Sequence, residues 1–171
     1  MRFELHSNGT NEHNTIFVNI IDDEGKTIGH TLIRSYTLWT KDHLNEEMQH
    51  VHKTTRRACL EAARHISMPG NIAYVGIIEL DHRERGRGYG PQVLQYIPQI
   101  CVQFGLPKPN AVCAYILPNM HKLDMQAYQN IPMSKQEYRV MYKTMHKTFR
   151  RAGFKKTHFL KPHVVTKVIT I

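Results

Sequence analysis

The chain has 171 residues, of which 41% are hydrophobic and 22% are charged, the balance of an ordinary globular domain with one core. Its 23 Lys and Arg residues outnumber 14 Asp and Glu residues, and the resulting formal charge of +9 should attract anions. No stretch approaches the roughly 20 apolar residues of a membrane span, and the first residues lack the apolar segment of a secretory signal. We therefore expect a cytoplasmic protein with no membrane partner.

The cysteines and histidines do not form a recognisable metal or disulfide pattern. Cys59, Cys101 and Cys113 are odd in number, far apart in the sequence and set among apolar residues, which favours reduced thiols in a core. His43, His50 and His52 offer no pair four residues apart and no acidic partner at ligand spacing. The sequence predicts no metal site.

The first third of the chain predicts strands. Residues 15–21 and 27–33 are rich in β-branched side chains, and the acidic, glycine-containing segment 22–26 suits a hairpin loop between them. Residues 1–7 can add an edge strand.

A long amphipathic helix is predicted over residues 41–67, on the substrate side of the domain. Its apolar positions recur at helical spacing, and Met68-Pro69-Gly70 ends the run. The other face is basic, which suits either a solvated surface or contact with an acidic substrate. The apolar positions are Leu44, Met48, Val51, Thr55, Ala58, Ala62 and Ile66.

The strongest local signal is a glycine-rich segment, Arg85-Gly86-Arg87-Gly88-Tyr89-Gly90, between an apolar strand-like run at 72–78 and a helix-like run that begins at Pro91. Alternating glycines let the backbone turn tightly, so that successive N–H groups and the next helix N-terminus can converge on one anion. Arg85 and Arg87 add positive charge. The segment is a candidate phosphate cradle; a glycine-rich turn without a ligand is the alternative.

Two common phosphate loops do not fit this segment. The dinucleotide fingerprint needs G-x-G-x-x-G, and Pro91 stands where its third glycine would fall. Gly25-Lys26-Thr27 imitates the end of a Walker A loop, but Ile20 replaces its first glycine and the acids 22–24 would repel a phosphate.

The second half of the chain predicts two more helices and two or three strands. The helix after the glycine segment ends near Gly105, and Pro98 inside it should kink or split it. Residues 111–117 are a near-continuous apolar run, typical of a buried strand. Ser134 and Glu137 form a capping box for a helix that Gly153 closes. Residues 157–160 and 164–171 can supply closing strands.

The pattern R-x-x-G-x-G from Arg85 to Gly90 resembles the acetyl-CoA pyrophosphate loop of the GNAT superfamily of N-acyltransferases. Leu80 stands five residues before the arginine, where the family places the last apolar residue of a splayed strand. Asn119 after the next strand, and Phe149 ahead of Gly153-Phe154, match further family positions. The match covers about residues 70–160.

The resemblance implies an α/β (α+β) fold in one domain, residues 1–171, with a mixed, mostly antiparallel central sheet flanked by helices and a cofactor-binding core at about 70–160. It implies acetyl-CoA as co-substrate. Residues expected to bind it are Ile78, Leu80, Arg85, Gly86, Arg87, Gly88, Tyr89, Gly90 and Asn119.

Three features depart from the family pattern. The helix at 41–67 lies between the hairpin and the loop strand, and residues 120–133 look like an insertion near the acceptor site. Phe149 stands where many members have a tyrosine that protonates the departing thiolate. Tyr142, two turns earlier on the same helical face, is our first substitute as general acid, ahead of Tyr138 and His146; a core-edge aromatic is the alternative role for it.

The resemblance implies direct transfer of an acetyl group to a primary amine. Glu79 is the acid nearest the expected thioester and a candidate base through water, or else a solvated residue at a strand end. The acceptor is open: the charge favours a tRNA-linked amine or an acidic protein, and a homodimer is also left open. A catalytically weak GNAT-like binding protein, which holds nucleic acid or a protein on a basic surface, is the alternative. The basic clusters considered are Lys147, Arg150, Arg151, Lys155 and Lys156, and Arg56, Arg57 and Arg64.

Overall fold

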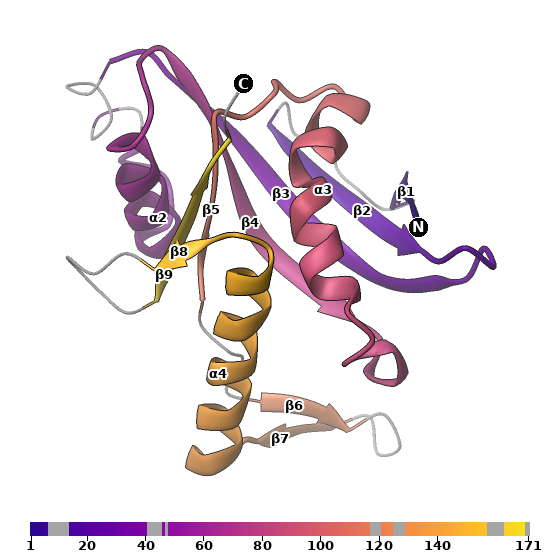
Figure 1. Ribbon diagram of the computed structural model, residues 1–171. Helices are drawn as coiled ribbons and strands as arrows, with labels where there is room; N and C mark the ends of the chain where they lie inside the picture. The colour runs from indigo at the N-terminus through magenta and orange to yellow at the C-terminus, as the bar shows by residue number, and fades with distance from the viewer. Residues whose placement is uncertain are drawn as a thin grey trace.

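A computed structural model describes residues 1–6, 14–40, 46, 48–116, 121–124, 129–156 and 163–169. A seven-stranded sheet runs through it in the order β1-β2-β3-β4-β5-β9-β8 (Figure 1). Only β4 and β5 are parallel, and the other neighbours are antiparallel, which confirms the predicted mixed sheet. The strands are β1 Arg2–Leu5, β2 Thr15–Ile21, β3 Thr27–Leu38, β4 Gly70–Leu80, β5 Ala111–Tyr115, β8 Lys155–Lys156 and β9 Val164–Val168.

The predicted hairpin of β2 and β3 forms around an acidic turn. The Asp22 carboxylate accepts hydrogen bonds from the backbone N–H of Glu24 at 3.0 Å and of Lys26 at 2.8 Å, and Gly25 supplies the positive φ of 84°. β1 adds at the edge as expected, with Phe3 opposite Ile20.

Helices cover both faces of the sheet. α3 (Tyr89–Gln103) and α4 (Lys135–Arg151) share one core with the sheet, in which Leu94, Ile97 and Phe149 pack on Val75 and Val112. α2 (Lys53–Ala63) packs in a separate core on the other face, mainly against β4, β5 and β9. No helix among the described residues is both long enough and apolar enough to cross a membrane.

The helix predicted over 41–67 is wrong in its extent. α2 begins only at Lys53 and ends at Ala63, and a turn occupies residues 48–50. His52 caps the helix with a non-helical ψ of 138°, and its ring accepts a hydrogen bond from the Thr54 N–H. Apolar periodicity continues through Met48, which is buried, but the cap breaks the helix. Residues 41–45 and 47 lie outside the described chain.

Pro98 does not split its helix. α3 is assigned as one helix of 15 residues with Pro98 inside it. Proline removes one hydrogen bond from the helical ladder. Ile97 and Cys101, on either side of it, are fully buried, so packing on the sheet holds the helix together despite that loss.

The predicted ends of α4 are confirmed. The Ser134 side chain accepts from the Glu137 N–H at 3.2 Å, and the Glu137 carboxylate accepts from the Ser134 N–H at 2.9 Å. At the other end, Phe154 N–H donates to Phe149 O and Gly153 has a φ of 89°, the pattern of a Schellman motif. The rings of Phe149 and Phe154 meet edge to face at 5.0 Å.

The Phe149–Gly153–Phe154 pattern therefore has a structural explanation. Phe149 is 3% exposed and lies in the core beneath α3 and α4, so its ring closes a helix and fills the core. The position at which family members often carry a tyrosine is here a buried apolar one.

The segment predicted as an insertion, 120–133, contains a hairpin of β6 (His121–Asp124) and β7 (Gln129–Pro132), which Figure 1 shows at the N-terminal end of α4. β9 confirms one predicted closing strand. The other, 157–160, and the candidate Asn119 lie outside the described residues.

All three cysteines are free thiols buried in the core, as expected from the sequence. Cys59 of α2 and Cys113 of β5 are neighbours, with their sulfur atoms 3.8 Å apart. Burial raises the pKa of Cys101 to about 12 and raises that of Cys113 well above its ordinary value, so both stay protonated.

Candidate functional site

The two parallel strands separate at one end of the sheet. β4 pairs with β5 only as far as Val75, opposite Ala114, whereas on its other side it stays paired with β3 as far as Leu80, opposite Gly29. Figure 1 shows β4 and β5 diverging below this point. The backbone of the last part of β4 therefore lacks a strand partner on the β5 side. Backbone N–H and C=O groups in such a place need another partner, and an extended ligand can provide it.

A bulge at Gly76 sets the faces of this strand end. The register with β3 shifts there, because Val75 lies opposite Ile33 but Ile77 lies opposite Leu32. A Cβ on Gly76 would come within 2.8 Å of Leu32 Cδ2, so a larger residue there would have to displace the end of the Leu32 side chain. The extra residue keeps Ile78 and Leu80 on the face of α3, where they pack against the core. It leaves Glu79 exposed.

The glycine-rich segment follows directly after this strand end. Gly86 and Gly88 have φ angles of 84° and 87°, and a Cβ built on either would meet no atom within 4 Å. Their backbone conformation favours glycine, and the space around them is open. Gly88 is the N-cap of α3 and provides no side-chain cap, and the first turn contains no acid. The N–H groups of that turn have no partner within the helix and carry the positive end of its dipole.

Gly90 and Leu80 form the floor of this cradle. A Cβ on Gly90 would come within 2.9 Å of the Thr148 methyl group on α4 and 3.9 Å from Leu80. Gly90 therefore lets the start of α3 approach α4 closely. Tyr89 is half-buried and packs in a small cluster with Ile20, Ile28 and Val93.

The two predicted arginines are tied to the protein around the cradle. Arg85 Nε donates to Leu80 O at 3.1 Å. Arg87 pairs with the buried carboxylate of Glu84 at 3.0 Å, and the Lys26 ammonium reaches the same carboxylate at 3.2 Å. Both arginines stay exposed, so the loop keeps a positive rim with one acid beneath it. The sequence did not predict this role for Glu84, because nothing local distinguishes it from the other acids of the chain.

Glu79, a predicted catalytic residue, pairs with a histidine on the neighbouring strand. Its Oε2 lies 3.4 Å from His30 Nε2, and the His30 ring packs edge-on against Phe17 at 5.0 Å. The carboxylate is 60% exposed. It lies on the sheet face opposite α3, beside the separated strand end. The partner His30 could be found from the sequence only by aligning β3 with β4 correctly.

Tyr142, the other predicted catalytic residue, lies in a cluster of rings. It meets His146 at 4.4 Å and His163 at 5.4 Å, both edge to face, and is stacked with Tyr138 at 6.5 Å. His163 in turn stacks on Tyr115 at 5.5 Å. Burial is the main cause that raises the pKa of Tyr142 above 10, with Tyr138 as the second cause.

This cluster links α4 to the point where the strands separate. Tyr115 is the last residue of β5 and follows Ala114, the last residue paired with β4. Among the described residues, His163 Nδ1 is buried without a hydrogen-bond partner. Tyr115 and His163 were missed in the sequence because single aromatic and histidine residues beside apolar strands carry no local signal.

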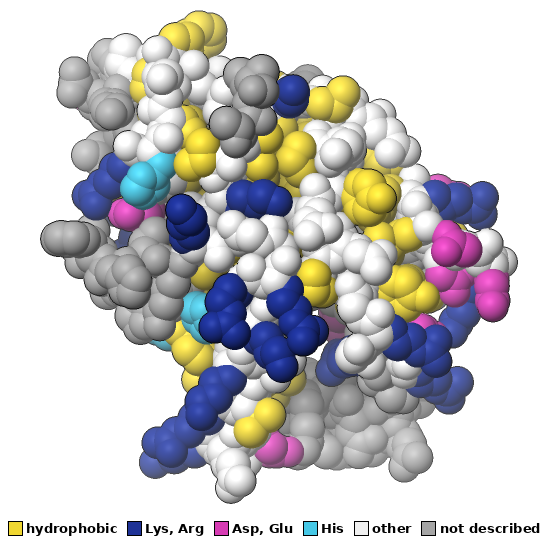
Figure 2. All heavy atoms as spheres, in the orientation of Figure 1, with side chains coloured by type: hydrophobic (Ala, Val, Ile, Leu, Met, Phe, Trp, Pro, Cys, Tyr) yellow, Lys and Arg dark blue, Asp and Glu magenta, His cyan; other side chains and the backbone are white. Residues whose placement is uncertain are grey.

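The two basic clusters do not border one cleft. Lys147, Arg150 and Arg151 are on α4, whereas Arg56 and Arg57 are on α2, which packs on the opposite face of the sheet. Figure 2 shows Lys and Arg side chains gathered over α4 and, separately, at the lower right over the segment between β4 and α3. The two clusters therefore belong to separate surfaces of the protein.

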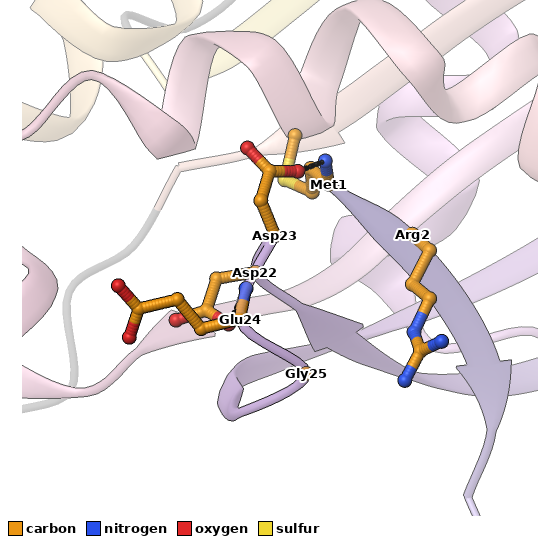
Figure 3. Close-up of a pocket in the computed structure, with 6 residues that line it drawn as sticks. All are labelled: Met1, Arg2, Asp22, Asp23, Glu24 and Gly25. Atoms are coloured by element: carbon orange, nitrogen blue, oxygen red, sulfur yellow. Dashed lines mark hydrogen bonds and ion pairs between the residues drawn. The ribbon is translucent and has the colours of Figure 1, made fainter.

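A surface hollow of about 450 Å³ lies elsewhere, between the start of the chain and the β2–β3 turn. Figure 3 shows its lining, in which the Met1 amino group pairs with Asp23. The Asp22 carboxylate already serves the turn, and the hollow is acidic, so it does not suit a phosphate ligand. No three His, Cys, Asp or Glu side chains among the described residues are grouped to hold a metal ion. The lining residues are Met1, Arg2, Asp22, Asp23, Glu24 and Gly25.

No protein-family model matches the chain, and no curated protein is similar to it in sequence. Solved structures with a similar arrangement include Tetrahymena GCN5, at 12% identity and a TM-score of 0.46 over 93% of this chain and 71% of that one. Arabidopsis thaliana NAA60 in complex with acetyl-CoA matches at 10% identity and a TM-score of 0.47, over 90% and 76%. A polyamine N-acetyltransferase of Drosophila melanogaster matches at 11% and 0.48, over 90% and 74%.

These likenesses are distant, so what this chain binds has to be judged from its own residues. From β4 onward, through the glycine loop, α3, β5 and α4, the elements follow the order that the GNAT resemblance predicts, whereas α2 between the hairpin and β4 departs from it.

Proposed function

We propose that the protein is an N-acetyltransferase that moves an acetyl group from acetyl-CoA to a primary amine. One observation carries the proposal: an open glycine cradle at a helix N-terminus directly follows a strand end that has lost its neighbour. A pyrophosphate joined to an extended amide-containing arm needs these two sites side by side.

The residues fit the two parts of the ligand. The N–H groups of Gly86 to Gly90 and the first turn of α3 suit the pyrophosphate, with Arg87 at the rim. The backbone of Ile78 to Leu80, which has no strand partner on the β5 side, suits the amides of the pantetheine arm. Arg85, which holds the strand end at Leu80 O, acts in this proposal by fixing the loop on the strand. Asn119 stays a predicted contact.

Bound acetyl-CoA would supply the thioester, and residues of this chain would position the two reactants and accept and donate the protons. We assign Glu79 to accept the amine proton through water, with His30 holding its carboxylate. We assign Tyr142 to return a proton to the leaving sulfur, because a phenol is protonated at neutral pH at its ordinary pKa of 10, and burial raises that pKa further. Holding the two reactants together can lower the activation barrier by roughly 7–11 kcal/mol. The base and the acid therefore need to supply only part of the rate acceleration.

Titration calorimetry with acetyl-CoA tests the cradle. We expect the wild-type protein to bind and Gly88→Glu to lose binding, since both its charge and its side chain would enter the open space. Gly105→Glu is the matched control, because Gly105 also has a positive φ, 81°, and open surroundings, but lies at the other end of α3. Equal loss in both variants, or no binding by the wild type, would refute the cofactor assignment.

The acceptor is the remaining half of the proposal. The exposed Glu79 favours an amine that arrives on the sheet face opposite α3, and the net charge of +9 favours an acidic carrier, such as an RNA-linked amine or an acidic protein. Labelled acetyl-CoA, offered with separate pools of tRNA, protein and small amines, will show which pool is labelled. Binding of acetyl-CoA with no labelled pool would support a binding protein instead.

A further inference from the structure

Helix α4 carries an unusually one-sided charge. Six of its residues are Lys or Arg, and Glu137 in the first turn is its only acid. All six cations are exposed. We call them the α4 basic row: Lys135, Arg139, Lys143, Lys147, Arg150 and Arg151.

The row follows the helix from end to end. From Lys135 to Lys147 the cations recur every four residues, a rise of about 6 Å per step, and the whole row spans about 24 Å. Met145 and Phe149, which pack in the core, lie on the other side of the helix. Figure 2 shows the dark blue side chains over this helix.

No acid among the described residues neutralises the row. Other cations are held by acids, such as Arg64 by Glu61 at 3.1 Å and Arg87 by Glu84 at 3.0 Å. Within the described part of the chain, no member of the α4 basic row forms an ion pair. Six unpaired like charges on one helix repel one another, a cost that a bound polyanion would remove.

We propose that the α4 basic row binds the phosphate backbone of a nucleic-acid duplex. Evenly spaced point charges on a straight helix suit the regular phosphates of a rigid duplex better than the irregular carboxylates of an acidic protein. Proteins that hold single strands stack bases on aromatic side chains. The other exposed residues of α4 are Gln136, Glu137, Val140 and Thr144, none of which is aromatic.

This surface is distinct from the glycine cradle, and the inference does not rest on the proposed acetyl transfer. α4 meets the cradle through Thr148, which lies against Gly90, whereas the row points away from the sheet. Duplex binding and acetyl-CoA binding should therefore fail independently.

Fluorescence anisotropy with labelled 20-base-pair RNA and DNA duplexes, in a salt series, tests the proposal. If four to five phosphates are contacted, log K should fall against log salt with a slope of about −4, and the dissociation constant should be on the order of micromolar at low salt. The duplex that binds more tightly identifies the source. Binding to neither, or tighter binding to a single strand of equal length, would overturn the proposal.

A charge-removing variant locates the site. Arg139→Gln/Lys143→Gln/Lys147→Gln should weaken duplex binding at least tenfold and flatten the slope by about 2.7, which is three phosphate contacts. Glutamine is close to lysine in helix propensity, so the helix should persist, as circular dichroism will show. Acetyl-CoA affinity should not change.

Lys53→Gln/Arg56→Gln/Arg57→Gln is the matched control, since it removes the same charge from α2 on the opposite face of the sheet. It should change affinity by less than about threefold and leave the slope unchanged. An equal loss in both triple variants would mean that only net charge matters, and competition by polyglutamate at equal charge would mean that any polyanion binds. Either result contradicts a duplex site on α4.

Discussion

Gly90 of α3 lies directly against Thr148 of α4, where an added Cβ would come within 2.9 Å of the threonine methyl group. This contact sets how closely the first turn of α3 approaches α4. Because that turn forms one side of the glycine cradle, the packing of two helices fixes the position of the candidate phosphate site.

We predict that Gly90→Ala destabilises the protein by about 1 kcal/mol, because overpacking outweighs the better helix propensity of alanine. Acetyl-CoA affinity should fall as the turn is displaced. Adding Thr148→Ser removes the methyl group but keeps a hydroxyl like the one that bonds Thr144 O at 3.0 Å. The double variant should regain both stability and affinity in urea unfolding and calorimetry. If Thr148→Ser rescues neither property, the contact does not control the cradle.

A second prediction concerns the acid beneath the loop. Glu84→Gln removes the carboxylate that holds Arg87 and Lys26, and should lower the free energy of unfolding by about 1–2 kcal/mol, less than a fully buried pair because both cations are half-exposed. Glu4→Gln is the comparison, since its ion pair with Arg2 is exposed at both partners and its loss should cost at most about 0.5 kcal/mol. Equal costs would mean that Glu84 is an ordinary surface acid.

Much of the fold could be predicted from the sequence because its signals are local. The hairpin turn at Asp22, the capping box at Ser134 and the stop at Gly153 each depend on residues a few positions apart. The glycine segment was placed correctly between strand and helix for the same reason.

The failures came from tertiary contacts and from competing local signals. Apolar residues recur at helical spacing throughout 41–67, although α2 starts only after the cap at His52. Such spacing shows which residues are buried, and it does not require one continuous helix. Pro98 predicted a break that packing of Ile97 prevents. In the site, the His30–Glu79 pair joins two strands, and the stacking of His163 on Tyr115 joins β5 to the residue before β9. No local pattern specifies either pairing.

A third prediction tests the assigned proton donor. Tyr142→Phe should lower kcat by about 100-fold if the phenol protonates the leaving sulfur. Because burial raises the pKa of Tyr142, the alkaline fall in wild-type kcat should lie above pH 10 and should disappear in the variant. Tyr138→Phe is the control, because Tyr138 lies one turn earlier and stacks on Tyr142. It should change kcat by less than about twofold, which is small beside the 100-fold loss expected for Tyr142→Phe. An unchanged kcat in Tyr142→Phe would remove the assignment and favour a structural ring.

The last prediction concerns stability in alkali. Burial, and next the neighbouring Cys59, raise the pKa of Tyr36 on β3 from 10.0 to about 12. The folded protein therefore holds this proton more tightly than the unfolded chain does, and the contribution is fully present below pH 10 and lost as the pH rises to 12. Tyr36→Phe should reduce the fall in the free energy of unfolding over this window, followed in urea, by on the order of 2 kcal/mol. The buried thiols, whose pKa is also raised, should keep the rest of the fall. Tyr96→Phe, at a ring that is 45% exposed, should leave the fall in place. A fall as large in Tyr36→Phe as in the wild type would assign alkaline unfolding to other groups alone, such as the buried thiols.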